Sequence, residues 1–500
     1  MLTLDRWISD RARTTPTRVA IDYRGTKTTY AELDERSDRL AAGFVETGLV
    51  RGDRVATLTG TSTEHVVVFF ACAKAGLILM PLNTRLAPPE LRYQLEDAEP
   101  AVLLCSDEWA ELGATLHDRT AGLEELVLNQ HKLSADGGGG GKEEGFVLIQ
   151  HKPSDDDGLL LVYTSGTTGK PKGALLTHAN CFWTNLSFDR VAGVSAEDTV
   201  LQVLPQFHVG GWNVQPLLAW WKGATVVLEP AFDPARALAL IAEKRVTTMM
   251  GVPATYLFMA QDPGFAGAEL WTLRRAVVGG APMPEALLET WHERGVEIVQ
   301  GYGLTEAAPN VLCLPPEDAA RKRGFAGKPY PHVDVALRDT ETGGLLDGAA
   351  EGELLVKGPN VFAGYWRNAG ATAAAFVDGW LVTGDIAARD DEGYYRIVGR
   401  TKDMVISGGE NVYPAEIENV LHEHPAVKEA AVVGVADERW GEACLAFVVL
   451  RGEATEEELL THCRGRLARY KVPKGVRFVE SLPRNALDKV VKSALAELAR

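Results

Sequence analysis

The 500-residue sequence predicts an α/β protein with a large N-terminal region of packed α/β subdomains and a small α+β C-terminal domain. Helical and strand patterns alternate through the first four hundred residues, which favours buried parallel strands. Past residue 400 the character changes, and strand-like stretches at 429–435 and 444–450 accompany two helical patterns. A chain of this length exceeds one compact core, so more than one domain is expected.

The N-terminal elements follow from local patterns. Residues 30–48 are apolar at helical spacing, which predicts an amphipathic helix. The apolar window at 66–82 is interrupted by a lysine, a glycine and a proline, so it predicts a buried helix and a buried strand rather than a membrane span. Short apolar strands are expected at 101–105 and 159–163. The glycine-rich stretch at 134–157 predicts a surface excursion.

The C-terminal elements have their own local signals. Thr455 with Glu458 has the pattern of a capping box, which predicts a helix start. The change of character places the domain boundary near Arg400–Asp403. We therefore expect one domain at 1–400 and a second at 401–500.

Composition and charge exclude several classes of protein. With 46% hydrophobic and 24% charged residues, the chain is expected to be globular. Its net charge of −17 argues against nucleic-acid or anionic-membrane partners. The six cysteines form no CxxC pair and the first ten residues lack a signal-peptide pattern, so a reduced, cytoplasmic protein is expected. Histidines other than His208 lack metal-ligand spacing and are predicted to lie on the surface.

The segment YTSGTTGKPKG at 163–173 follows the predicted strand at 159–163. Its glycines allow the backbone to approach a ligand, its hydroxyls donate hydrogen bonds and its lysines add positive charge, which together suit a phosphate. The segment does not match the Walker pattern, because Pro171 stands where that pattern needs serine or threonine. It therefore predicts a phosphate-binding loop that is not a P-loop.

Five segments together resemble the AMP-forming acyl-adenylating enzymes, which include acyl-CoA synthetases, nonribosomal-peptide adenylation domains and beetle luciferases. They are YTSGTTGKPKG at 163–173, GYGLTE at 301–306, GWLVTGD at 379–385, GRTKDMVISGGENVYPAEIE at 399–418 and PRNALDK at 483–489. The resemblance, of the fatty-acid–CoA ligase or 4-coumarate–CoA ligase type, implies a mobile C-terminal domain. It also implies a two-step reaction, in which a carboxylate and ATP give acyl-AMP and pyrophosphate and coenzyme A then displaces AMP.

The same resemblance implies the nucleotide and metal contacts. Thr167 and Glu306 would flank Mg²⁺, and a hydroxyl with a carboxylate suits this hard cation. Asp385 would accept both ribose hydroxyls, and Tyr302 would stack on adenine. The implied nucleotide contacts are Thr164, Ser165, Gly166, Thr167, Thr168, Gly169, Lys172, Gly280, Ala281, Pro282, Gly301, Tyr302, Gly303, Thr305, Asp385 and Arg400.

Lys489 is the residue that the resemblance assigns to the reacting carboxylate and the α-phosphate, reached from the C-terminal domain. Asp488 departs from the pattern, because the family has glycine there. Lys492 is a second candidate, although a solvated helix lysine is the expected role for it. Lysine on a mobile domain can deliver charge to one half-reaction and leave in the next.

The remaining implied contacts concern coenzyme A. Lys402 matches the hinge position of the family. Rotation there would bring Ser407, Gly408 and Gly409 to the pantetheine channel, where small residues leave room. Trp440 is a further candidate for the coenzyme, and a half-buried surface tryptophan is equally expected.

His208, in PQFHVGG, is expected to gate the acyl pocket and to act with the catalytic residues Lys489, Glu306 and Thr167; a structural histidine is the alternative. The pocket is expected along 205–221, 250–256, 276–284 and 301–304, where His208 is the only side chain that can carry a charge. Burying an unpartnered second charge would be costly, so an apolar monocarboxylic acid is predicted. Trp212 and Tyr256 would close the far end, unless they belong to the core.

The predicted function is therefore an ATP- and Mg²⁺-dependent acyl-CoA synthetase for a small-molecule carboxylic acid, with a medium-chain fatty acid as the first expectation. An aryl acid of the cinnamate, coumarate or benzoate type is the alternative, and so is an adenylating enzyme that loads a carrier protein. A non-enzymatic relative is disfavoured, because Lys489, Glu306 and Asp385 are all present. The sequence leaves the oligomeric state open, a homodimer included.

Overall fold

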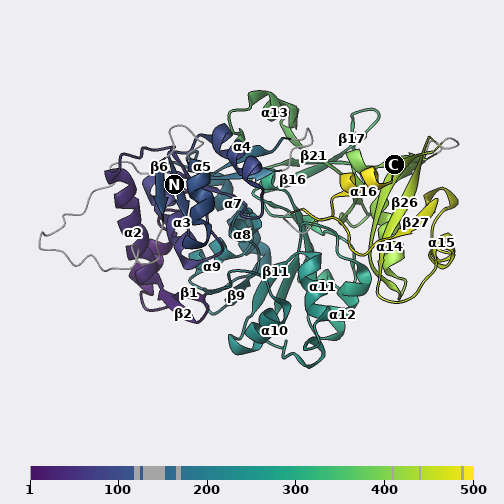
Figure 1. Cartoon of the computed structure of the whole chain (residues 1–500), viewed down its shortest axis with the longest axis horizontal. Helices are drawn as coiled ribbons and strands as arrows, with labels where there is room; N and C mark the ends of the chain where they lie inside the picture. The colour runs from purple at the N-terminus through teal and green to yellow at the C-terminus, as the bar shows by residue number, and fades with distance from the viewer. Residues whose placement is uncertain are drawn as a thin grey trace, which may run out of the picture.

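The computed structural model of the chain describes residues 2–117, 124–127, 153–164, 170–407, 410–437, 441–485 and 489–499. They form a large N-terminal part and a small C-terminal domain that lies at one end of the molecule (Figure 1). Most of the predicted excursion at 134–157 lies outside the described residues. Within the described ranges, no helix is both long and apolar enough to cross a bilayer.

The largest sheet has nine strands in the order β15-β14-β13-β12-β11-β9-β10-β1-β2. The six strands from β13 to β1 are parallel neighbours, as the alternating pattern predicted, and β14, β15 and β2 are antiparallel. The strands are β1 (Val19–Tyr23), β2 (Thr26–Thr29), β9 (Thr199–Gln202), β10 (Thr225–Leu228), β11 (Thr248–Gly251), β12 (Arg275–Val278), β13 (Ile298–Gly303), β14 (Asn310–Cys313) and β15 (Lys328–Pro329).

A second sheet of the N-terminal part has seven strands in the order β19-β8-β7-β4-β3-β5-β6. Two of them, β5 and β7, confirm the predicted strands at 101–105 and 159–163. The strands are β3 (Arg54–Leu58), β4 (Ile78–Pro81), β5 (Val102–Cys105), β6 (Glu124–Val127), β7 (Gly158–Thr164), β8 (Lys172–Thr177) and β19 (Gly364–Tyr365).

Helices cover these two sheets. Helix α2 confirms the predicted amphipathic helix, and its first turn is closed by a capping box between Thr29 and Glu32. Helix α3 is buried almost all round and leads into β4, which confirms the buried helix and strand predicted at 66–82. The helices of the N-terminal part are α1 (Trp7–Thr14), α2 (Tyr30–Glu46), α3 (Thr63–Ala75), α4 (Pro88–Ala98), α5 (Ala110–His117), α7 (His178–Ala192), α8 (Gly210–Asn213), α9 (Pro216–Lys222), α10 (Pro234–Glu243), α11 (Pro253–Gln261), α12 (Glu285–Glu293) and α13 (Ala369–Ala374).

The prediction that the other histidines lie on the surface is wrong for His65 and His178, which are 2% and 0% exposed. Both are held by polar neighbours: His65 Nε2 lies 3.0 Å from Thr57 Oγ1, and His178 Nδ1 accepts from the Leu4 amide at 3.1 Å. Burial lowers the pKa of His65 to about 3 and that of His178 to about 4, so both imidazoles are neutral near pH 7. The sequence spacing did not reveal their burial.

A third, six-stranded sheet connects the large part to the C-terminal domain. Its hairpin of β21 and β22 pairs Asp385 with Arg400 at the open end and turns over at 390–394. The strands are β16 (Asp334–Arg338), β17 (Leu345–Leu346), β18 (Ala350–Lys357), β20 (Phe376–Val377), β21 (Trp380–Arg389) and β22 (Tyr395–Arg400).

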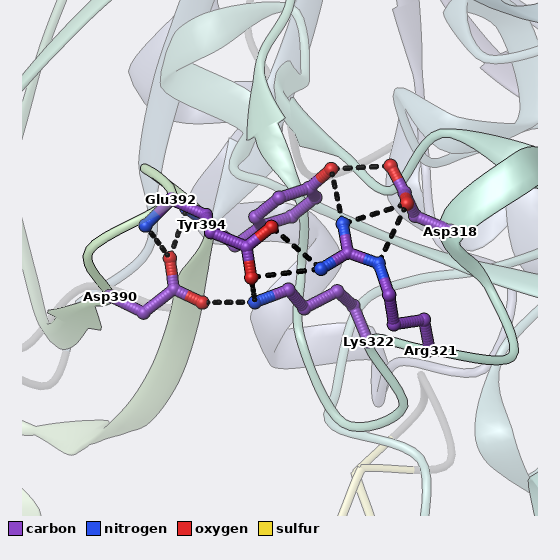
Figure 2. Close-up of polar contacts among 6 residues, drawn as sticks. All are labelled: Asp318, Arg321, Lys322, Asp390, Glu392 and Tyr394. Atoms are coloured by element: carbon purple, nitrogen blue, oxygen red, sulfur yellow. Dashed lines mark hydrogen bonds and ion pairs between the residues drawn. The ribbon is translucent and has the colours of Figure 1, made fainter.

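A polar network holds the tip of this hairpin to the segment that follows β14 (Figure 2). Lys322 Nζ contacts Asp390 Oδ2 at 2.6 Å, and Arg321 contacts Glu392 at 2.6 Å. The hydroxyl of Tyr394 donates to Asp318, and Lys328 Nζ lies 4.3 Å from the centroid of the Tyr394 ring. Linked ion pairs hold a geometry better than isolated surface pairs, so the network fixes the tip of the hairpin.

The C-terminal domain has a five-stranded sheet and its own hydrophobic core. The predicted capping box of Thr455 and Glu458 is confirmed at the start of α15. The sequence predicted two strands and two helices for this domain, and the structure has more of both. The strands that were missed are short, with too few residues to show alternation. The elements are β23 (Val405–Ser407), β24 (Glu410–Val412), β25 (Val427–Asp437), β26 (Gly441–Leu450), β27 (Gly475–Phe478), α14 (Pro414–His422), α15 (Glu456–Arg464) and α16 (Lys492–Leu498).

Candidate active site

The four stretches predicted to form the acyl pocket lie at or after the carboxyl ends of neighbouring strands in the nine-stranded sheet. Three of them contain or follow the carboxyl ends of β11, β12 and β13, and residues 205–221 come shortly after β9. These four strands are consecutive neighbours and parallel. The carboxyl ends of parallel strands form the usual ligand-binding edge of such a sheet.

The predicted phosphate loop connects the antiparallel strands β7 and β8. Thr164, the last residue of β7, pairs with Lys172, the first of β8, and Thr164 Oγ1 donates to the Lys172 carbonyl at 3.4 Å. The pairing closes the base of the loop and fixes where it leaves the sheet. Its predicted contacts Ser165, Gly166, Thr167, Thr168 and Gly169 lie outside the described residues.

The predicted ribose and adenine residues meet although they are far apart in the sequence. Tyr302 donates its hydroxyl hydrogen to Asp385 Oδ2 at 2.6 Å, and Arg400 Nε contacts Asp385 Oδ1 at 2.7 Å. These two contacts hold one carboxylate oxygen each and so orient the group. Asp385 is also buried, with 4% of its surface exposed. Burial and the neighbouring Asp385 carboxylate raise the pKa of Tyr302 well above its usual value, so the phenol stays protonated. Asp385 therefore presents fixed acceptor oxygens of the kind that a vicinal diol requires.

Lys489 reaches from the C-terminal domain to the predicted purine border. A Cβ placed on Gly280 would lie 3.7 Å from Lys489 Cε and 3.8 Å from its Nζ. Gly280 has φ +82°, and it is exposed together with Ala281 and Pro282. Asn485 holds the base of the lysine, because its amide donates to the Lys489 carbonyl and its Oδ1 accepts from the Lys489 amide.

Charges of the site act on Lys489. Desolvation of its ammonium group lowers the pKa of Lys489; the positive charge of Arg400 acts in the same direction, and Asp385 opposes it. The lysine therefore lies within electrostatic reach of the residues predicted for the ribose. Lys492, the second candidate, instead pairs with Glu418 of its own domain at 2.7 Å.

His208 lies near Lys489 in a buried environment. Its Nε2 atom is buried and has no hydrogen-bond partner among the described residues, and its ring meets Phe207 edge-on at 4.5 Å. Burial lowers the pKa of His208 to about 3, assisted by the positive charges of Lys489 and Arg85. The imidazole is therefore neutral near pH 7. The four acyl-pocket stretches contain no lysine or arginine of their own, and the positive charges that act on His208 come from Lys489 and Arg85 outside them.

The expectation that Trp212 and Tyr256 close the acyl pocket is wrong for this structure. Both side chains are 0% exposed, so no water-sized space reaches either ring. Trp212 stacks on Phe69 and donates its indole N–H to the Gln206 carbonyl at 2.6 Å. Tyr256 donates to the Val277 carbonyl at 2.9 Å. Both aromatic side chains belong to the core, which was the alternative prediction. They therefore give no basis for a limit on the length of the acyl chain.

Glu306, the predicted metal ligand, lies in the short 3-10 helix η3 (Thr305–Ala307) directly after β13. Its Oε1 accepts the hydroxyl hydrogen of Tyr365 at 2.8 Å. The phenol occupies one lone pair of this carboxylate, and its remaining lone pairs suit a hard cation such as Mg²⁺. The sequence interpretation missed Tyr365, since nothing in the local pattern of AGYWRN connects it with a glutamate 59 residues earlier.

The residues predicted for coenzyme A lie on the C-terminal domain. Ser407 is buried at the end of β23 and pairs with Gly441, while Gly408, Gly409 and Trp440 lie outside the described residues. Lys402, the predicted hinge, is exposed in the 3-10 turn η5 (Thr401–Asp403) directly after β22. The remaining predicted contacts, Gly301, Gly303 and Thr305, are half-buried where β13 ends and η3 begins.

Comparison with known proteins agrees with this arrangement. Residues 8–366 match the AMP-binding enzyme family, and residues 416–489 match the AMP-binding enzyme C-terminal domain. A feruloyl-CoA synthase of an Amycolatopsis species is 42% identical over 98% of this chain and 97% of its own. An indoleacetate–CoA ligase of Aromatoleum aromaticum is 40% identical (99% and 98%), and the long-chain-fatty-acid–CoA ligase FadD13 of Mycobacterium tuberculosis is 39% identical (94% and 92%).

Solved structures agree equally well. ATP-bound MatB from Rhodopseudomonas palustris superposes with a TM-score of 0.90 at 34% identity, covering 99% of this chain and 98% of MatB. The o-succinylbenzoate coenzyme A synthetase MenE of Bacillus subtilis, in complex with ATP and magnesium ion, gives a TM-score of 0.85 at 32% identity, with 98% and 99% covered. The chain thus belongs to the AMP-binding enzyme family, and it is an AMP-forming acid–CoA ligase.

Proposed function

We propose that the enzyme activates an aryl-substituted monocarboxylic acid of the cinnamate or ferulate type. The observation that carries this proposal is that the four acyl-pocket stretches contain no aspartate, glutamate, lysine or arginine, and that their one histidine, His208, has a buried Nε2 atom and is neutral. Feruloyl-CoA synthase and indoleacetate–CoA ligase, both named for aromatic acids, are 42% and 40% identical to almost the whole chain. With Trp212 and Tyr256 in the core, the first expectation of a medium-chain fatty acid loses its structural basis, and the aryl alternative is better supported.

In the first half-reaction, an acid carboxylate attacks the α-phosphate of ATP, and two anions must therefore come together. We infer that Lys489 provides positive charge beside the attacking carboxylate and that Lys172 binds the departing pyrophosphate. Glu306 and Thr167 would hold Mg²⁺, which when bound neutralises part of the phosphate charge. Asp385 and Tyr302 orient the ribose and the adenine, so the α-phosphate is presented in line.

In the second half-reaction, the coenzyme A thiolate attacks the acyl carbonyl and AMP leaves. We propose that the domains divide into 1–400 and 401–500 and that the smaller one rotates about Lys402. The rotation would withdraw Lys489 and bring Ser407, Gly408, Gly409 and Trp440 toward the thiol route. In this proposal, the contact of Lys489 with Gly280 belongs to the adenylating pose.

A panel of acids tests the substrate class. Ferulate, cinnamate, benzoate, octanoate, palmitate, malonate and phenylalanine would be ranked by kcat/KM for coenzyme A-dependent AMP formation. We expect ferulate or cinnamate to rank first and malonate and phenylalanine last, because an unpartnered second charge is costly to bury. Malonate or phenylalanine at the top would overturn the uncharged-pocket argument.

A fatty acid is the second candidate, favoured by the 39% identity to a long-chain-fatty-acid–CoA ligase. Octanoate or palmitate at the head of the same ranking would replace the aryl proposal by this one. An assay with free coenzyme A and no protein acceptor distinguishes the proposal from loading of a carrier protein. The proposal requires AMP and a thioester to accumulate under these conditions.

A further inference from the structure

A short segment at 359–365 connects two parts of the nucleotide site that are far apart in the sequence. The Phe362 amide donates to the Glu306 carbonyl at 2.9 Å. Three residues later, Tyr365 in strand β19 pairs with Ala174 of β8, the strand that begins at Lys172. The segment therefore fixes the distance between the predicted metal ligand and the predicted phosphate lysine.

The side chain of Tyr365 contacts both of these residues. Its hydroxyl donates to Glu306 Oε1 at 2.8 Å, and Lys172 Nζ lies 5.2 Å from the centroid of its ring. A lysine over an aromatic face at this distance is attracted by the ring.

The backbone around Tyr365 leaves the ring little freedom. Gly364 has φ +137°, and a Cβ there would lie 2.8 Å from Thr372 Cγ2, so no other residue fits without strain. The Tyr365 amide donates to Thr372 Oγ1 at 2.9 Å, and the ring meets Phe362 edge-on at 4.9 Å. The tyrosine is thus held independently of Glu306 and Lys172 and can serve as their reference point.

We infer that Tyr365 is a positioning residue for adenylation, which orients the Glu306 carboxylate toward the divalent cation and holds the Lys172 ammonium group beside the terminal phosphates of ATP. The inference rests on the proposed role of Glu306 as metal ligand. With one oxygen held by the phenol, the carboxylate presents its other oxygen in a fixed direction. The ring similarly restricts a lysine side chain that would otherwise sample many rotamers.

The test separates the two contacts. Tyr365→Phe removes the hydroxyl and keeps the ring, whereas Tyr365→Leu removes both. Binding of ATP would be measured by titration calorimetry, with EDTA and with a series of Mg²⁺ concentrations, next to pyrophosphate release with the best acid of the panel. In Tyr365→Phe, we expect the Mg²⁺ concentration that gives half-saturation to rise about tenfold. The affinity for ATP in EDTA should be unchanged. In Tyr365→Leu, ATP binding in EDTA should also weaken by about threefold.

Tyr394 provides a matched control, because its hydroxyl also donates to a carboxylate, that of Asp318 (Figure 2). Its ring also has a lysine above it, since Lys328 Nζ lies 4.3 Å from the ring centroid. Tyr394→Phe and Tyr394→Leu should keep the wild-type dependence on Mg²⁺ when assayed below their melting temperatures. If they change it as much as the Tyr365 variants do, or if folded Tyr365→Phe responds to Mg²⁺ like the wild type, the positioning role is refuted.

Glu306→Gln distinguishes failure of this inference from failure of the role on which it rests. A wild-type Mg²⁺ dependence in Glu306→Gln would refute both. If Glu306→Gln weakens the response, adding Tyr365→Phe should change it little further, because the phenol acts through that carboxylate. Additive effects would refute the inference and leave the metal ligand in place. The substrate class is decided by the acid panel alone.

Discussion

Removing the ammonium group of Lys489 should stop the first half-reaction and spare the second. In the structure, Lys489 Nζ stands 3.8 Å from the position of a Cβ on Gly280, at the predicted purine border, and Asn485 holds its backbone on both sides. Lys489→Ala removes the charge and leaves this backbone contact available. The variant therefore tests the charge and not the fold.

The expected size of the effect follows from electrostatics. Two unit charges 4 Å apart attract by about 4 kcal/mol at an effective dielectric constant near 20, which corresponds to about a thousandfold in rate. Water entering the vacated space recovers part of this energy. We therefore expect adenylation to fall by about a hundredfold or more in Lys489→Ala, the range found when one charge-stabilising contact is removed from a transition state.

Two assays check this expectation. Single-turnover pyrophosphate release measures adenylation, and thioester formation from supplied acyl-AMP and coenzyme A measures the second half. Lys492→Ala is the control, because Lys492 pairs with Glu418 inside the C-terminal domain. It should adenylate at close to the wild-type rate. Equal losses in both half-reactions of Lys489→Ala, or an equal loss in Lys492→Ala, would refute the assignment.

Three further predictions concern the same site. The kcat/KM for adenylation should fall as pH rises through the pKa of Lys489, because only the protonated ammonium group carries the charge. This pKa lies below the usual 10.5, and Lys489→Ala should lack the fall in kcat/KM at alkaline pH. Asp385→Asn should raise the KM for ATP by about tenfold, since an amide replaces one of two acceptors by a donor, and an unchanged KM would contradict the ribose role. Lys402→Pro, which fixes φ near −65°, should slow thioester formation from acyl-AMP more than adenylation, and normal coenzyme A turnover would place the hinge elsewhere.

The sequence by itself determined the elements whose signals are local. The helix that starts at Tyr30 was predicted from its apolar spacing and the helix after Thr455 from its capping box, because both signals involve residues only three or four positions apart. The five motifs likewise gave the family, and with it the residue types of the site. Short strands such as β23 and β27 were missed, because three or four residues cannot establish an alternation.

Tertiary packing alone decided which distant residues meet. Tyr302 and Asp385 are 83 positions apart, and their contact depends on how the third sheet is seated against β13. The hydrogen bond from Tyr365 to Glu306, the approach of Lys489 to Gly280 and the burial of Trp212 and Tyr256 in the core have the same origin. Apolar spacing predicts that a side chain is buried but not which neighbours bury it, since those neighbours come from other strands and helices.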